Sequence, residues 1–176
     1  MGLSGGPTQD EVMAISLFKS GLKAGDSFVD VGCGTGKVSI EASRLARKVY
    51  AIDRRSEAIA CARSAAEQAE AFNIEFFEGE AVDFLQDIGP VDCAFVGGSR
   101  GLSRILDLLA DIVSGNIVVN AVKLETLHEA VLSMRRLGIF KEAVSVQVCR
   151  SHGIAGGMMF RPIDPVYVIV GGKEKC

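Results

Sequence analysis

The chain has 176 residues, of which 48% are hydrophobic and 23% are charged, and its net charge is −3. A chain of this size can bury a self-sufficient core, and its composition excludes an intrinsically disordered protein. The acidic balance argues against a nucleic-acid-binding surface, and no apolar run reaches the roughly 18 residues of a membrane span. We therefore expect a single domain over residues 1–176, with no nucleic acid and no membrane as partner.

Strands and helices alternate along most of the chain. Short apolar, β-branched runs are separated by segments whose apolar residues recur at helical spacing. The predicted strands are 27–31, 49–52, 74–77, 91–96 and 116–122, and the predicted helices are 37–46, 56–71, 81–86, 102–113 and 124–137. Such alternation predicts an α/β fold with a doubly wound, Rossmann-like, mostly parallel sheet.

The end of the chain has a different pattern. Two further strands, 143–149 and 165–170, have no helix between them. We expect them to pair as an antiparallel C-terminal hairpin around a mobile loop, 150–161, which completes a seven-stranded sheet. The apolar residues Met158, Met159 and Phe160 in this loop predict either a subunit interface or a buried turn.

A glycine-rich loop follows the first predicted strand, and Asp53 ends the second strand about 20 residues further on. Glycines let the backbone approach a ligand closely, and an acid at that place accepts hydrogen bonds from both hydroxyls of a ribose. Asp30, just before the loop, disfavours a pyrophosphate and suits a cation such as the sulfonium or ammonium of S-adenosylmethionine. The alternative is a turn that only connects strand to helix. The loop consists of Gly32, Cys33, Gly34, Thr35 and Gly36.

These motifs resemble those of the class I S-adenosylmethionine-dependent methyltransferases. The resemblance rests on residues 29–36 and on 51–53, and it covers nearly the whole chain. It implies S-adenosylmethionine as the methyl donor and a sheet whose seventh strand is antiparallel.

Shorter motifs are similar to those of a narrower family, the decarboxylating C15-methyltransferases of precorrin-7 or cobalt-precorrin-7 in cobalamin biosynthesis, also called precorrin-8w decarboxylases. They occupy residues 6–8, 49–54, 78–81, 96–99, 124–126 and 157–159. This resemblance implies methyl transfer to C15 of a precorrin-7-type tetrapyrrole, decarboxylation of the ring acetate side chain, and a homotetramer. It implies cofactor binding at Thr8, at the loop from Gly32 to Gly36, at Asp53 and at Ala81. Thr8 also opens a Thr-x-x-Glu sequence, which predicts a capping box on the first helix.

Basic residues near the strand ends are candidates for binding the carboxylates of such a substrate. Arg100 follows the fourth strand, and Arg150 and Arg161 flank the C-terminal loop. Each has the alternative of a solvated surface residue. The Gly97-Gly98 pair after the fourth strand offers no side-chain acceptor for a planar amino group, which weakens a nucleobase or amide substrate.

No catalytic residue is assigned from the sequence. Glu125 and His152 are candidates for supplying a proton during decarboxylation, although Glu125 has the alternative of a charge that stabilises a helix N-terminus. The five cysteines form no Cys-x-x-Cys pair, which favours reduced, mostly buried thiols in a cytoplasmic protein and no metal site.

Two other functions stay open at this point. One is a class I methyltransferase that acts on another small molecule or on a protein carboxylate. The other is a non-catalytic module that binds S-adenosylmethionine. The sequence also leaves open whether the substrate contains cobalt, and whether the 150–161 loop binds substrate or a neighbouring subunit.

Overall fold

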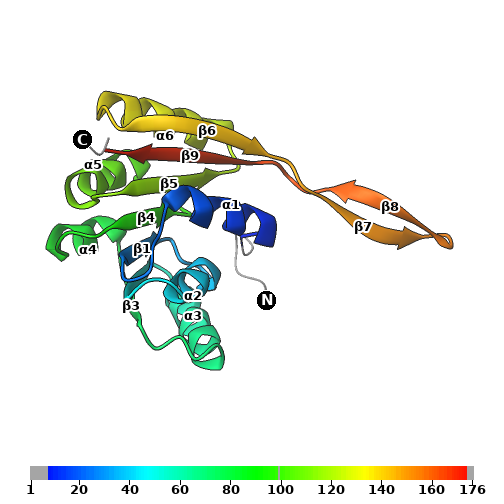
Figure 1. Cartoon of the computed structure of the whole chain (residues 1–176), viewed down its shortest axis with the longest axis horizontal. Helices are drawn as coiled ribbons and strands as arrows, with labels where there is room; N and C mark the ends of the chain where they lie inside the picture. The colour runs from blue at the N-terminus through cyan, green and yellow to red at the C-terminus, as the bar shows by residue number, and fades with distance from the viewer. Residues whose placement is uncertain (1–7, 99, 174–176) are drawn as a thin grey trace.

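The computed structural model describes residues 8–98 and 100–173 (Figure 1). Gly6, Pro7 and Ser99, which belong to two of the family motifs, lie outside the described residues. The helices are α1 (Asp10–Ser20), α2 (Lys37–Ser43), α3 (Ser56–Gln68), α4 (Ala81–Asp87), α5 (Leu102–Ile112) and α6 (Leu124–Arg136). The strands are β1 (Ser27–Val31), β2 (Lys48–Asp53), β3 (Ile74–Glu78), β4 (Cys93–Val96), β5 (Asn116–Ala121), β6 (Phe140–Val146), β7 (Cys149–Ile154), β8 (Gly157–Pro162) and β9 (Val166–Gly172).

Seven of the strands form one sheet in the order β3-β2-β1-β4-β5-β9-β6. Strands β1 to β5 are parallel to their neighbours, whereas β9 pairs antiparallel with both β5 and β6. The predicted α/β class, the mostly parallel seven-stranded sheet and the antiparallel pairing near the C-terminus are therefore confirmed. The order reverses between β1 and β4, so the carboxyl ends of these two strands flank a crevice that is the usual ligand site in such sheets.

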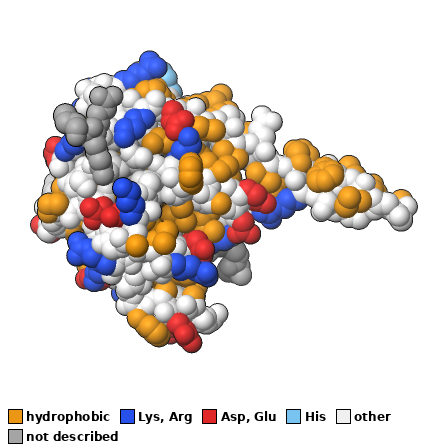
Figure 2. Space-filling view, in the orientation of Figure 1, with side chains coloured by type: hydrophobic (Ala, Val, Ile, Leu, Met, Phe, Trp, Pro, Cys, Tyr) orange, Lys and Arg blue, Asp and Glu red, His pale blue; other side chains and the backbone are white. Residues whose placement is uncertain are grey.

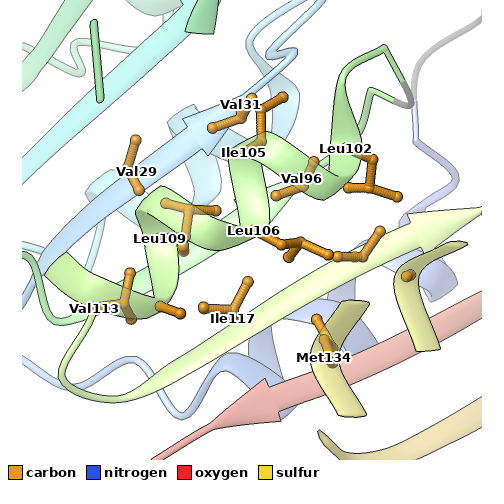
Figure 3. Packing of buried hydrophobic residues seen from close by; sticks show 14 of the residues in the cluster. Val29, Val31, Val96, Leu102, Ile105, Leu106, Leu109, Val113, Ile117 and Met134 are labelled. Atoms are coloured by element: carbon orange, nitrogen blue, oxygen red, sulfur yellow. The ribbon is translucent and has the colours of Figure 1, made fainter. Parts of the chain in front are cut away.

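Helices cover both faces of the sheet, because side chains of the central strands alternate between two apolar layers. Phe28 and Phe95 pack with α1 and α2. Val29 and Val96 point to the opposite face and pack with α5, as the close view in Figure 3 shows. This core holds the carboxyl ends of β1 to β5 in fixed positions, and the loops that follow them inherit that rigidity.

Residues 150–161 are not the mobile loop that the sequence predicts. They form most of a two-stranded antiparallel ribbon, β7–β8, which projects away from the main sheet beyond the ends of β6 and β9 (Figure 1). Its turn has two residues with positive φ, Ala155 at 44° and Gly156 at 79°, as a tight hairpin with right-handed strand twist requires. The long strand predicted over 143–149 is therefore interrupted after Val146 and resumes at Cys149.

The predicted capping box at Thr8 is also wrong. Helix α1 begins one residue later, with Gln9 as its N-cap and no side-chain cap hydrogen bond. The two acids of the first turn have other partners, because Asp10 pairs with Lys37 and Glu11 pairs with Arg150. Ion pairs with distant elements thus replace the local cap.

The cysteines are only partly buried. Of the four cysteines in the described part, Cys33 and Cys93 are buried while Cys61 and Cys149 are exposed, so the expected burial holds for two.

Among the described residues, no helix has the length and apolar character needed to cross a membrane.

Candidate active site

A pocket of about 590 Å³ lies at the carboxyl ends of β1 to β4. Each of these strands contributes the loop that follows it, so residues far apart in the sequence meet around one space. The lining includes Thr8, Asp30, Gly32, Cys33, Gly34, Thr35, Lys37, Asp53, Arg54, Arg55, Glu80, Ala81, Val82, Gly97, Gly98, Arg100 and Ile105. The pocket occupies the crevice at the topological switch point of the sheet.

Glycines allow two of the loops to come close together. Gly32 has φ of 77°, and a Cβ there would lie 3.0 Å from the backbone nitrogen of Gly98. The Gly97 N–H donates to the Val31 carbonyl at 2.9 Å, which fastens the loop after β4 to the end of β1. Gly97 and Gly98 therefore do more than turn the chain, because they form one wall of the pocket against the β1 loop.

Gly36 has a different role from the other glycines of its loop. It is not among the residues that line the pocket. A Cβ on Gly36 would lie 2.8 Å from the Cβ of Ala62, and its φ is 77°. Gly36 thus lets the start of α2 pack against α3, which fixes the position of the loop without contact with a ligand.

Asp30 lines the pocket and has a buried carboxylate oxygen without a hydrogen-bond partner in the described part of the chain. The side chain is fully buried, and its Oδ2 accepts a hydrogen bond from Ser39 Oγ at 2.5 Å. Its Oδ1 has no hydrogen-bond partner within the described part of the chain. Burial raises the pKa of Asp30 to about 7, against the opposing effect of the Ser39 hydrogen bonds and with a smaller contribution from the nearby Asp53 charge. A cation in the pocket would satisfy Oδ1 and favour the ionised form.

Cys33 is a wall of the pocket and not a nucleophile. Burial, with the charges of Asp30 and Asp53, raises the pKa of its thiol far above the usual range. Since the thiolate is the reactive form of cysteine, this side chain stays protonated and inert at neutral pH.

Asp53 is held by the loop after β1 and by its own neighbour. Gly34 N donates to Oδ2 at 3.0 Å, and the Arg55 side chain donates from Nη2 to Oδ2 at 2.9 Å and from Nε to Oδ1 at 3.0 Å. Burial acts to raise the pKa of Asp53, but these hydrogen bonds and the Arg55 charge outweigh it and hold that pKa below its usual value. Asp53 is therefore ionised at neutral pH.

The structure brings together most of the residues that the sequence assigned to the cofactor. Thr8, Gly32, Cys33, Gly34, Thr35, Asp53 and Ala81 all line the pocket. Thr8 contributes through its backbone as well, since its carbonyl accepts a hydrogen bond from Lys37 Nζ at 3.0 Å.

Of the candidate residues for substrate binding and proton transfer, one lines the pocket and the others do not. Arg100 lines the pocket. Arg150 and Arg161 face each other across the β7–β8 ribbon, outside the lining, and Arg150 Nη2 donates to Glu11 Oε2 at 2.8 Å. Glu125 is exposed in the first turn of α6, and His152 lies on β7, so neither lines the pocket.

Arg55 and Lys37 are two of the lining residues that the sequence did not predict. Arg55 stands two residues after the acid that ends β2, close enough to pair with it, and Lys37 follows the glycine loop directly. A basic residue at either place is the signal that could have identified them. Within residues 8–98 and 100–173, no group of His, Cys, Asp or Glu side chains is arranged to hold a metal ion.

The pocket has the features needed for a ligand with a ribose and a cationic group. Asp53 can accept from a diol, the Asp30 oxygen can receive the cation, and Ala81 offers a small wall beside them. Together with the strand order, the glycine loop after β1 and the acid after β2, this arrangement defines a class I methyltransferase fold.

The particular family follows from comparison with known proteins. The chain belongs to the precorrin methyltransferase family, whose domain model matches residues 4–172. A relative from Methanosarcina acetivorans, named probable cobalt-precorrin-6B C(15)-methyltransferase (decarboxylating), is 47% identical over 177 residues, which cover 98% of this chain and 96% of the relative.

Two solved structures are similar over nearly the whole chain. The precorrin 8w decarboxylase of Methanobacterium thermoautotrophicum has a TM-score of 0.92 and 36% identity, with 96% of this chain and 92% of that one covered. The precorrin-6Y C5,15-methyltransferase of Geobacter metallireducens has a TM-score of 0.89 and 34% identity, with 95% and 91% covered. The expected family and fold are thereby confirmed.

Proposed function

We propose that this chain, as a single domain, transfers the methyl group of S-adenosylmethionine to C15 of a cobalt-precorrin and removes the ring acetate carboxyl group as CO2, in cobalamin biosynthesis. The observation that carries the proposal is a pocket that joins the glycine loop, Asp53 and the unpartnered Asp30 oxygen in a chain of the precorrin methyltransferase family. The names of the curated relatives give cobalt-precorrin-6B as the acceptor, whereas the motif resemblance implied a precorrin-7-type compound.

The residues of the pocket fit the methyl donor in three places. Asp53 is ionised and lies at the end of β2, where it can accept from the two ribose hydroxyls. The charge of the buried Asp30 carboxylate, in a side chain that lines the pocket, favours a positive charge there, because a buried carboxylate without a compensating partner is costly. Ala81, at the start of α4, is small enough to lie beside the adenine.

The acceptor side follows from the strand order. Asp53 and Ala81 follow β2 and β3, on one side of the central strand β1, and Arg100 follows β4 on the other side. The exposed apolar side chains of Val122 and Leu124 follow β5, the next strand along. A flat apolar macrocycle with carboxylates at its rim fits this side, with Arg100 as a partner for one carboxylate.

The role of the protein in this reaction is mainly alignment and exclusion of water. S-adenosylmethionine supplies a methyl group that is already activated on a sulfonium, so a strong protein base is not needed. The glycine loop and Asp53 hold the donor end in a fixed place, and the wall formed by Gly97 and Gly98 leaves room for an acceptor carbon in line with it. The proton donor for decarboxylation stays unassigned, with Glu125 and His152 as the predictions.

The deciding experiment is a product analysis by mass. The protein is incubated with S-adenosylmethionine and either cobalt-precorrin-6B, its cobalt-free form or a precorrin-7 preparation. Gain of one methyl group with loss of CO2 supports the proposal and identifies the acceptor. Methyl transfer to none of them, with cofactor binding retained, favours another acceptor or a non-catalytic binding module.

We also propose that the active form is a homotetramer assembled through the β7–β8 ribbon, in the cytoplasm and without nucleic acid or membrane. Both faces of the ribbon carry exposed apolar side chains: Phe160 is 62% and Met158 68% exposed on one face, and Met159 and Ile154 lie on the other. Figure 2 shows hydrophobic side chains along the projecting ribbon. Exposed apolar side chains gathered on one element mark an interface.

Sedimentation analysis tests this assembly. The Phe160→Asp variant is expected to sediment as a smaller species than the wild-type tetramer. Phe18→Asp, which changes an equally apolar exposed residue on α1, is the control and should leave the assembly intact. A monomeric wild type, or an unchanged Phe160→Asp variant, would refute the ribbon as the interface.

A further inference from the structure

We propose that Arg55 is a latch on Asp53, which must swing away before the ribose of the cofactor can bind and which closes again once the spent cofactor has left. The inference rests on the proposed function, because it takes an adenosyl ligand as the occupant of the pocket. Arg55 acts through Asp53 and is therefore a positioning residue.

The hydrogen bonds of Asp53 carry the argument. Its Oδ1 accepts from Arg55 N at 3.1 Å and from Arg55 Nε at 3.0 Å. Its Oδ2 accepts from Gly34 N at 3.0 Å and from Arg55 Nη2 at 2.9 Å. An ionised carboxylate has about four lone-pair sites, two on each oxygen, and here each oxygen already has two donors. A ribose diol that donates two hydrogen bonds needs two of these sites.

Only one donor group can leave without disturbing the fold. The two backbone N–H groups belong to the β1 loop and to the start of α3, both of which are fixed by the core. The Arg55 guanidinium is on a long side chain that is 28% exposed, while the Asp53 side chain is 4% exposed. Nη2 would lie 3.9 Å from a Cβ on Gly34, so the guanidinium also covers the loop along which the ligand must lie.

A second acidic residue is available to the displaced guanidinium. Glu57 is two residues further on, in the first turn of α3, and its charge acts on Arg55 in the present arrangement. Rotation of the Arg55 side chain toward Glu57 and solvent exchanges one carboxylate partner for another. When the Arg55 guanidinium is bound, Asp53 is ionised and each of its oxygens has two hydrogen-bond donors. When the guanidinium has rotated away, the two acceptor sites that it occupied are available to the ribose.

The consequence is an affinity lower than the pocket could otherwise provide. Binding must break a partly exposed, charge-assisted pair before it gains the diol contacts, and pairs of this kind have a modest but measurable free energy. Because the pair must open before the ribose can bind and re-forms only after the ligand has left, the latch should lower the association rate more than it raises the dissociation rate.

Calorimetry and stopped-flow fluorescence with S-adenosylmethionine and S-adenosylhomocysteine test the latch. Arg55→Leu should bind both about two- to fivefold more tightly than the wild type, mainly through faster association. Arg55→Lys, which can donate to one carboxylate oxygen only, should lie between them. The control is Arg44→Leu, which removes an arginine from an exposed pair with Glu41 away from the pocket and should leave affinity unchanged.

An Asp53→Asn background provides the second arm. If the gain comes from unmasking the carboxylate, then Arg55→Leu should add nothing there. Equal or weaker binding by Arg55→Leu, with Arg44→Leu unchanged, would overturn the latch while the cofactor assignment stands. A wild type that binds neither ligand would overturn the cofactor assignment itself and the latch with it. Thermal melting of each variant shows that the fold is retained.

Discussion

The pocket and the β7–β8 ribbon differ in how their side chains are buried and paired. At the pocket, a buried parallel sheet holds polar side chains with fixed partners, and among the described lining residues Asp30 has a buried carboxylate oxygen, Oδ1, without a hydrogen-bond partner. In the ribbon, two strands project beyond the main sheet, and apolar side chains such as Phe160 stay exposed. The side chains that can bind a ligand thus lie where the packed core fixes their positions, and the exposed apolar side chains lie beyond the end of the core.

The largest expected difference between the two regions is in folding stability. Gly36→Ala should lower the free energy of unfolding by about 3 kcal/mol, because the new Cβ meets Ala62 and the backbone is left-handed. Gly156→Ala in the ribbon turn has the same backbone strain with nothing within 4 Å, and should cost about 1 kcal/mol. Urea denaturation measures both, and equal losses would mean that the α2–α3 contact at Gly36 is unimportant.

The next effect is on cofactor affinity. Asp53→Ala should weaken S-adenosylmethionine binding by about 2 kcal/mol, or about thirtyfold, because the ribose loses a charged acceptor. The folded state should persist, since the Arg55 side chain that loses its contacts with Asp53 is partly exposed. Calorimetric titration gives the affinity and circular dichroism the fold. Unchanged affinity in the folded variant would remove Asp53 from the site.

These contrasts also separate what sequence could predict from what it could not. The β-α alternation and the spacing from the glycine loop to Asp53 are local patterns, so the sheet and most of the pocket were predictable. The ribbon was missed because its turn has Ala155-Gly156, without the Asn-Gly or Asp-Gly pair that normally marks such a hairpin.

Pairing between side chains was the other gap. Whether Asp53 is shared with Arg55 depends on one rotamer, and whether Asp30 has one partner or two depends on how Ser39 of α2 meets β1. The start of α1 was misplaced for the same reason, since Asp10 and Glu11 pair with Lys37 and Arg150. No spacing rule contains the two long-range pairs of α1.

The pH dependence of ligand binding distinguishes Asp30 from Asp53 within the pocket. The pKa of Asp30 is raised to about 7, whereas that of Asp53 is lowered, so only Asp30 changes charge near neutrality. A cationic ligand favours ionised Asp30, and affinity should therefore fall by about tenfold between pH 8 and pH 6. Asp30→Asn should flatten this profile. A flat profile in the wild type would place the cation elsewhere.

The same group sets a stability trend of known sign. The folded protein keeps the Asp30 proton up to about pH 7, while the unfolded chain releases it near the ordinary value of 3.8. The folded state binds more protons in that window, so the contribution of Asp30 to the free energy of unfolding is full below pH 4 and is lost as the pH rises toward 7. Urea denaturation of the wild type and of Asp30→Asn at several pH values isolates this contribution.

The smallest expected effect on the cofactor comes from the charges of the ribbon. Replacing Arg150 and Arg161 with Gln removes one exposed ion pair, Arg150 with Glu11, which solvent screens strongly. The affinity for S-adenosylmethionine should change by less than about twofold, because neither arginine lines the pocket. If both residues bind carboxylates of the tetrapyrrole, its affinity should fall and lose most of its salt dependence.

Affinities for both ligands at two ionic strengths decide how separate the two regions are. A loss confined to the tetrapyrrole would extend the substrate site onto the ribbon, from its own chain or from a neighbouring subunit. An unaltered tetrapyrrole affinity would instead place the carboxylate-binding residues near Arg100, inside the pocket. Parallel weakening of both ligands would break the comparison, because α1 carries the partners of both regions: Asp10 pairs with Lys37 at the pocket and Glu11 with Arg150 on the ribbon. That result would make α1 the element that couples ribbon to pocket.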